Sequence, residues 1–177
     1  MSTATLVRIQ AATAVEICSR FNLPPAAHAL LRQEMDPLEF AAALVANKHY
    51  AAGIDFLAHA LPPREAIWWA YLCMQHARGG AWSEPERAAL IAGVRWVLQP
   101  GEENRAAAKA TAPGAGLASL PGLIAMAVFL TGSPGGASKS IAIAVKAAAT
   151  KNDPARLLDT QRLFVNLGIE VAEGRII

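Results

Sequence analysis

Apolar residues recur at the spacing of an α-helix along most of the chain. One stripe follows the order i, i+1, i+4, i+7 and i+8 and stops at a Gln-Pro-Gly break; its members are Leu90, Ile91, Val94, Val97 and Leu98. Residues at this spacing lie on one face of a helix, because 3.6 residues complete each turn. A second stripe between residues 157 and 171 predicts a last helix that ends near Gly174.

Polar caps mark the positions at which several helices begin. The clearest are Asp36 in DPLEF, Ser83 in SEPERAAL and Asp153 in NDPARLL. In each segment a side-chain oxygen can accept from amides that the first helical turn leaves unpaired, and a proline lies where its missing N–H does no harm. Glu39 and Glu86, three residues after the first two caps, can complete capping boxes.

The same periodicity predicts further helices at 11–22, 25–34, 37–47, 49–60 and 63–78. We therefore expect an all-α fold, a single-domain helical bundle or short helix-pair array of about seven to nine helices. Residues 1–100 form an N-terminal helical block in this prediction, and residues 101–177 form a C-terminal helical part packed on it. The segments LPPAAHAL (23–30) and LPPREAIW (61–68) hint at an internal repeat, although they share few identical positions.

Composition favours closely packed helices. Hydrophobic residues make up 54% of the chain and charged residues 17%, and alanine, the best helix former, dominates the apolar fraction. No apolar run reaches the ~18–20 residues of a membrane span, and the N-terminus does not resemble a signal peptide, so we expect a cytoplasmic protein without membrane contact. A net charge of +2 without basic–aromatic clusters does not favour nucleic-acid binding.

The helix expected at 63–78 contains a Trp-Trp pair and is apolar over most of its circumference. Such a helix is usually central in a fold, so we expect it at the centre of this one. Trp68 and Trp69 project about 100° apart and cannot contact the same neighbour. We therefore expect one indole in the core and the other nearer the surface, where tryptophan often anchors a protein partner. The sequence does not indicate which is which.

The segment TGSPGGASKS (131–140) lies between two apolar runs and resembles a phosphate-binding loop. Lys139 and Ser140 match the last two positions of the Walker pattern. Ser133 and Ser138 replace the glycines that let the backbone amides face a phosphate, and no acidic residue follows until Asp153. We therefore expect an interhelical loop that does not bind ATP or GTP.

No metal, cofactor or catalytic site is expected. Cys73 and His76 can share a helix face, but zinc requires three or four ligands. Two cysteines do not make a disulfide framework, and Cys18 and Cys73 are expected to be buried thiols. The carboxylates fall mostly at helix starts, where they favour the positive end of the helix dipole.

Residues 50–75, YAAGIDFLAHALPPREAIWWAYLCMQ, resemble the central signature of a family of small, alanine-rich bacterial proteins of unknown function. MDPLEFAAALVANKHY before this stretch and AVFLTGSPGGASKSIA after it fit the same pattern, although the family usually has a fuller glycine–serine–proline loop. Family members occur near type VI secretion genes. The resemblance implies an accessory, adaptor or chaperone role and transfers no functional residues.

Our leading expectation is a non-catalytic interaction protein, an adaptor or chaperone that handles a secreted effector or spike component. Its expected partner-binding residues are Arg64, Trp68, Trp69 and Trp82, and homo-oligomerisation is left open. The alternatives are a small hydrolase or nucleotide-dependent enzyme whose site assembles only in three dimensions, and an immunity protein with one tight partner. A deep polar pocket that gathers His59, His76, Arg64 or Glu65 would favour the enzyme, whereas a broad exposed apolar surface would favour the adaptor.

Overall fold

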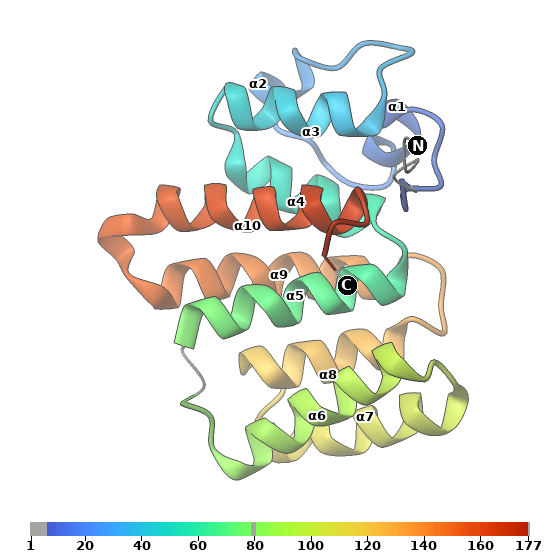
Figure 1. The fold of residues 1–177 in the computed structure, drawn as a ribbon, viewed down its shortest axis with the longest axis vertical. Coiled ribbons are helices and arrows are strands. Elements are labelled where there is room, and N and C mark those ends of the chain that lie inside the picture. Colours follow the sequence, from blue (N-terminus) through green and yellow to red (C-terminus); the bar gives the residue numbers. More distant parts are fainter. Residues whose placement is uncertain (1–6, 79–80, 177) are drawn as a thin grey trace, which may run out of the picture.

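The computed structural model describes residues 7–78 and 81–176 and confirms the all-α fold (Figure 1). These residues form ten α-helices and one 3₁₀-helix, one α-helix more than the upper end of the expected range. The helices are α1 (Ala14–Cys18), α2 (Pro25–His28), α3 (Pro37–Ala46), α4 (Tyr50–Ala60), α5 (Pro63–Arg78), α6 (Glu84–Leu98), α7 (Glu102–Ala115), α8 (Leu120–Leu130), α9 (Gly136–Asn152), η1 (Pro154–Arg156) and α10 (Leu157–Ala172).

The helices stack in successive layers along the long axis of the molecule (Figure 1). Helices α1 to α3 lie at one end, α4 and α10 follow, and α5 and α9 form the next layer. Helices α6, α8 and α7 complete the opposite end. The two halves of the chain interleave, because α9 packs against both α4 and α5 while α10 packs against α3, α4 and α5.

Helix α5 lies at the centre, as its apolar circumference predicts. It packs against α6, α8, α9 and α10. The repeat hinted at by the two LPP segments does not produce equivalent helices, since the first gives the four-residue α2 and the second opens the sixteen-residue α5. The second LPP is followed by a long apolar run, whereas the first leads into exposed residues 32–34 and a new cap at Asp36.

The largest fully buried side chain is that of Trp69, where α4, α5 and α10 meet. Its indole Nε1 donates to the Phe164 carbonyl oxygen at 2.8 Å. Gly168, one turn further along α10, lets the helix approach: a Cβ there would lie 2.7 Å from Leu57 and 3.0 Å from the indole. A glycine on one helix therefore accommodates the largest side chain of another.

The predicted helix starts at Asp36 and Ser83 are confirmed. The Asp36 carboxylate accepts from the amides of Leu38 (2.8 Å) and Glu39 (3.2 Å). Ser83 is the N-cap of α6, and the Glu86 carboxylate accepts from its amide at 2.9 Å and from its hydroxyl at 2.8 Å. Asp153 caps the 3₁₀-helix that leads into α10.

Within residues 7–78 and 81–176, no helix combines the length and apolar character needed to cross a membrane.

Replacing Asp36 with alanine should lower the free energy of unfolding by ~0.5–2 kcal/mol, because two first-turn amides of α3 lose their acceptor. Chemical denaturation of the wild type and of Asp36→Ala measures this difference. Asp36→Asn, which keeps a capping oxygen, should recover most of the loss. Equal midpoints for the wild type and Asp36→Ala would contradict the capping role.

Trp69→Ala should destabilise the fold by ~3–5 kcal/mol, the usual cost of removing a buried large aromatic side chain. Gly168→Ala should cost about 1–3 kcal/mol, because its methyl group would overlap Leu57 and the rigid indole. Gly101→Ala is the matched control, since a Cβ at Gly101 meets no atom within 4 Å. Equal melting temperatures for Gly168→Ala and Gly101→Ala would show that the close approach of α10 to Leu57 and Trp69 does not contribute to stability.

Candidate functional site

Two neighbouring hollows open on the face formed by α5 and α6. The larger has a volume of about 480 Å³. It is mainly apolar and contains two cations; its lining residues are Tyr71, Gln75, Trp82, Arg87, Leu90, Ile91, Val94, Arg95 and Leu98. We call this hollow the α5–α6 groove. Trp82, one of the expected partner-binding residues, forms part of its wall.

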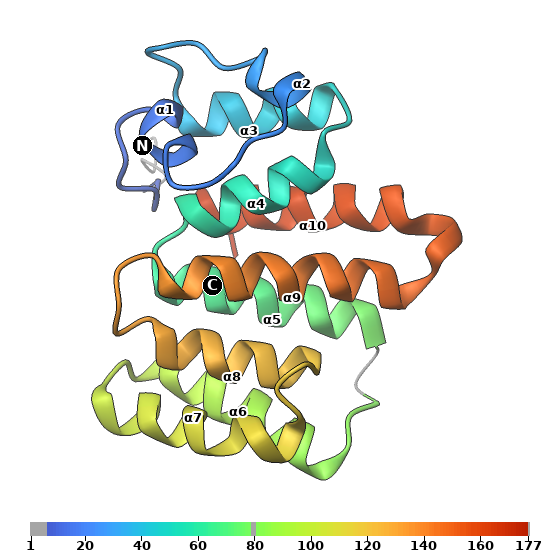
Figure 2. The same ribbon diagram turned by 180° about the vertical axis from the view of Figure 1, so that it is seen from behind.

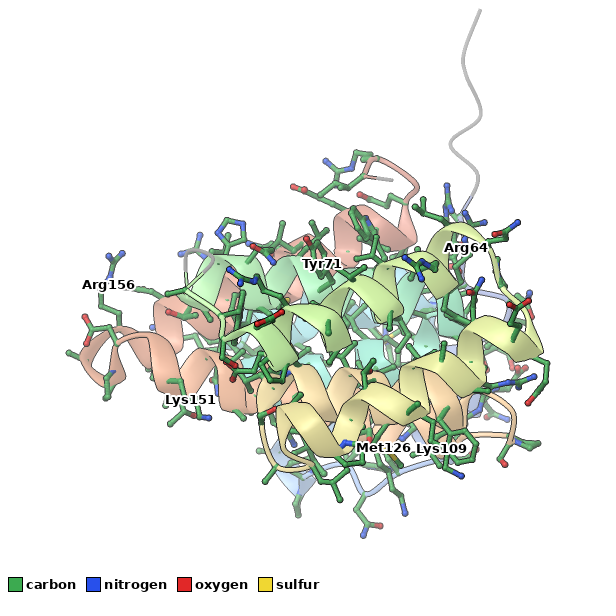
Figure 3. All side chains as sticks on the ribbon, turned by 90° about the horizontal axis from the view of Figure 1, so that it is seen from below. Arg64, Tyr71, Lys109, Met126, Lys151 and Arg156 are labelled. Atoms are coloured by element: carbon green, nitrogen blue, oxygen red, sulfur yellow. The ribbon has the colours of Figure 1, made fainter. Side chains whose placement is uncertain are left out.

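The smaller hollow continues from the groove past the end of α6 and has a volume of about 170 Å³. Leu98 lines both, so the two adjoin at this side chain. Arg64 and Trp68, two more of the expected partner-binding residues, line the smaller one. Three of the four residues singled out in the sequence are thus brought to one face. Viewed from below, Arg64 and Tyr71 lie on one side of the molecule and Lys109 and Met126 on the other (Figure 3).

Hydrogen bonds hold the smaller hollow in shape. The Arg64 guanidinium donates from Nε to the Val97 carbonyl oxygen at 2.7 Å. A cation at the C-terminal end of α6 satisfies a carbonyl that the helix leaves unpaired and favours the negative end of its dipole. On the other wall Arg8 pairs with Glu65 at 2.9 Å. The hollow is therefore bounded by charged side chains that are already engaged.

The two adjacent tryptophans differ as expected, one in the core and one nearer the surface. Trp69 is fully buried against α10, so its side chain does not lie on the surface at which we had expected it. Trp68 is half-buried and stacks on Tyr71, with ring centroids 5.4 Å apart and ring planes 18° from parallel. The buried Nε1 of Trp68 has no hydrogen-bond partner among the described residues.

The most exposed part of the groove was not predicted. Ile91 is 57% exposed and Leu98 is 73% exposed, whereas Leu90 and Val97, on the same predicted stripe, are buried. Only part of this stripe packs into the core. Ile91 and Leu98 remain exposed and form an apolar rim of the groove. The sequence did contain a signal for this rim. Ile91 and Leu98 are seven residues apart, so they lie on one helix face, and each comes directly after a core residue, which places that face beside the core-facing one.

The residues whose gathering would indicate an enzyme are dispersed. His59 lines a pocket beside Arg20 and Lys139, and Arg64 and Glu65 line the smaller hollow of the α5–α6 face. His76 lies in a third pocket beside Arg156 and Asp159.

The neighbouring Cys73 and His76 do not form a joint site. Cys73 is fully buried, and burial raises the pKa of its thiol well above the ordinary value. His76 is exposed. Cys18 is also a buried thiol, and burial raises its pKa to about 11. A thiol of raised pKa is a poor nucleophile at neutral pH. Across the part of the chain that the structure describes, no three histidine, cysteine or carboxylate side chains cluster to hold a metal ion.

The glycine-rich segment that resembles a phosphate loop joins two helices. It connects α8 to α9, whereas a Walker loop follows a strand. Gly135 has the left-handed φ of +69° that ends the turn, and α9 begins at the next residue. Lys139 lies one turn into α9. The loop is therefore interhelical, as expected from its missing glycines.

Comparison with known proteins gives a family and no function. No curated protein and no solved structure matches the chain. The model of a family of unknown function (DUF6931) matches residues 40–172, from Phe40 in α3 to Ala172, the last residue of α10. The match covers both the Trp-Trp helix and the glycine-rich loop, and it spans well over half of the sequence. The chain therefore belongs to this family of unknown function, DUF6931.

Proposed function

We propose that the protein is a non-catalytic adaptor or chaperone that binds another protein through the α5–α6 groove. The observation that carries this proposal is the pair of adjoining, mainly apolar hollows, one lined by Trp82 and the other by Trp68, with the exposed Leu98 lining both. Large exposed aliphatic side chains beside tryptophans are typical of protein-binding surfaces, where a few buried aromatic anchors supply most of the affinity.

The charges of the groove favour a particular kind of partner. Arg87 and Arg95 line it, and none of the described residues in its lining is acidic. Cations beside an apolar groove fit an amphipathic helix whose apolar face is bordered by Asp or Glu. We infer that the partner presents such a helix, with its apolar residues on Ile91 and Leu98 and its carboxylates near the two arginines.

The proposed biological setting rests on the family resemblance alone. The signature at residues 50–75 implies an association with type VI secretion genes, so we propose an effector or spike component as the partner. An immunity protein would also use one protein surface, but it would bind a single neighbouring toxin. The dispersal of His59, His76 and Glu65 over three hollows makes the enzyme alternative less favoured.

Substitutions on the rim of the groove should abolish partner binding without unfolding the protein. Leu98→Glu places a negative charge beside the path of an acidic helix and removes an exposed apolar contact. We expect affinity purification from the native host, followed by mass spectrometry, to recover the partner with the wild type. Recovery should fall about tenfold or more with Leu98→Glu.

Leu158→Glu is the matched control, because Leu158 is similarly exposed (62%) but lies on α10 away from the groove. It should retain the partner at the wild-type level, and both variants should melt near the wild-type temperature. Equal recovery of the partner with Leu98→Glu and the wild type would contradict the proposed surface. Recovery of an enzyme's substrate would favour the enzyme alternative instead, and recovery of a single toxin would favour the immunity protein.

Trp68→Ala should weaken partner binding while costing far less stability than Trp69→Ala, because Trp68 is only half-buried and faces the smaller hollow. Thermal denaturation and the purification assay, run on the same two variants, separate the effects. Similar unfolding by both substitutions would show that both indoles are structural.

A further inference from the structure

A hollow that shares no lining residue with the α5–α6 groove lies where the α4–α5 turn meets the α8–α9 loop. Both segments lie along the same side of the stack, at the left in Figure 2. The hollow has a volume of about 530 Å³, and we call it the basic pocket. Its lining residues are Gln10, Ala11, Arg20, His59, Ala60, Leu61, Pro62, Pro63, Pro134, Gly135, Ser138 and Lys139. Among the residues that the structure describes, this lining includes two cations and no carboxylate.

The cations of the basic pocket are available to a ligand. Lys139 is exposed and forms no ion pair with the described residues. Arg20 is also exposed. One of its guanidinium nitrogens donates to the His59 carbonyl oxygen at 3.2 Å, and the guanidinium has further N–H groups that can donate to a ligand. The nearby Asp55 carboxylate is held by Lys146 at 2.6 Å.

The start of α9 adds an electropositive wall. Gly135, its N-cap residue, has no side chain and gives this seventeen-residue helix no side-chain cap. The Gly136 amide donates to the Ser133 carbonyl oxygen at 3.2 Å, so it is the following first-turn amides that face no cap. Uncapped amides at a helix start, together with the helix dipole, favour an anion. Ser138, in the first turn, lines the pocket and contributes a hydroxyl group.

His59 supplies the independent observation that points to a ligand. Its side chain is only 9% exposed, yet it lines the pocket. Nδ1 lies 2.8 Å from the Asp55 carbonyl oxygen, which can only accept, so Nδ1 carries the proton. Nε2 is then an acceptor, and it has no partner among the described residues. The Phe21 ring stacks on the imidazole, with centroids 4.7 Å apart, and fixes its plane.

The neutral form of His59 is the stable one in this setting. Burial lowers the pKa of the imidazole below its ordinary value, and the charges of Arg20 and Lys139 lower it further. The hydrogen bond to the Asp55 carbonyl and the Asp55 charge act in the opposite direction. A ligand of the basic pocket must therefore carry negative charge for the cations and also a hydrogen-bond donor for Nε2.

We propose that the basic pocket binds a small phosphorylated polyol, such as a sugar phosphate. Its phosphate contacts Lys139, Arg20 and the first turn of α9, and one of its hydroxyl groups donates to Nε2 of His59. Among the described residues, no Phe, Tyr or Trp lines the pocket to stack on a base, which favours a polyol phosphate over a nucleotide. The pocket shares no lining residue with the α5–α6 groove, and this inference is independent of the proposed adaptor function.

Isothermal titration calorimetry of the full chain tests the pocket, with glucose 6-phosphate, glucose, inorganic phosphate and AMP as probes. We expect glucose 6-phosphate to bind, glucose not to bind, and both inorganic phosphate and AMP to bind more weakly than glucose 6-phosphate. Lys139→Gln should weaken glucose 6-phosphate binding about tenfold or more, because one charge-assisted hydrogen bond is lost. Lys151→Gln, an exposed lysine at the other end of α9, is the matched control and should bind as the wild type does.

The role of His59 is tested in the wild-type protein, so that no variant has to fold. The ¹⁵N chemical shift of its Nε2 should move on addition of glucose 6-phosphate, as expected when a bare imidazole nitrogen accepts a hydrogen bond. Absence of glucose 6-phosphate binding, or equal binding by Lys139→Gln and the wild type, would overturn the pocket. Tighter binding of AMP or inorganic phosphate, or an unmoved Nε2 resonance in the saturated protein, would overturn the polyol assignment.

Discussion

The contact between the Trp69 indole and α10 is the constraint on which the rest of the structure depends. It joins the centre of the chain to its last helix, through the Phe164 carbonyl and the space left by Gly168. Because Trp69 is fixed in the core, the helical rotation of α5 is fixed too. Trp68, the next residue, is thereby turned toward the smaller hollow of the α5–α6 face. A core contact thus determines which side chains are offered to a partner.

The α4–α5 turn connects this core to both candidate surfaces. Pro63 lines the basic pocket, while Arg64, the next residue, lines the smaller hollow and binds the end of α6. The basic pocket and the smaller hollow therefore lie on either side of one short, proline-rich segment of backbone. The basic pocket and the α5–α6 groove share no lining side chain. Their chemistry differs: the groove is apolar with an arginine border, and the pocket is polar and cationic.

Local patterns predicted the longer helices well, since caps and periodicity depend on neighbours in the chain. The helices expected at 11–22 and 25–34 are shorter than predicted, at Ala14–Cys18 and Pro25–His28. Helix α5 has the expected bounds, and Asp36 and Ser83 begin helices as expected. The choice between Trp68 and Trp69 was not predictable, because α5 is apolar nearly all round and the close approach of α10 at Gly168, which accommodates Trp69, is seen only in the folded chain. The sequence placed Ile91 and Leu98 on the same apolar stripe as Leu90 and Val97. Which part of that stripe is buried depends on how α6 packs, so the exposed rim was not predicted. The basic pocket was missed since Arg20, His59 and Lys139 are far apart in the sequence and meet only in the folded chain.

The central claim is that the rim of the α5–α6 groove contacts a partner protein in the native host. Photocrosslinking in living cells tests it directly, with p-benzoylphenylalanine placed at position 91 or 98 and, as a reference, at position 158 on α10. We expect the first two positions to crosslink to the same protein and position 158 not to crosslink to it. Crosslinks to one protein from position 158 alone, or no crosslink from either groove position, would contradict it.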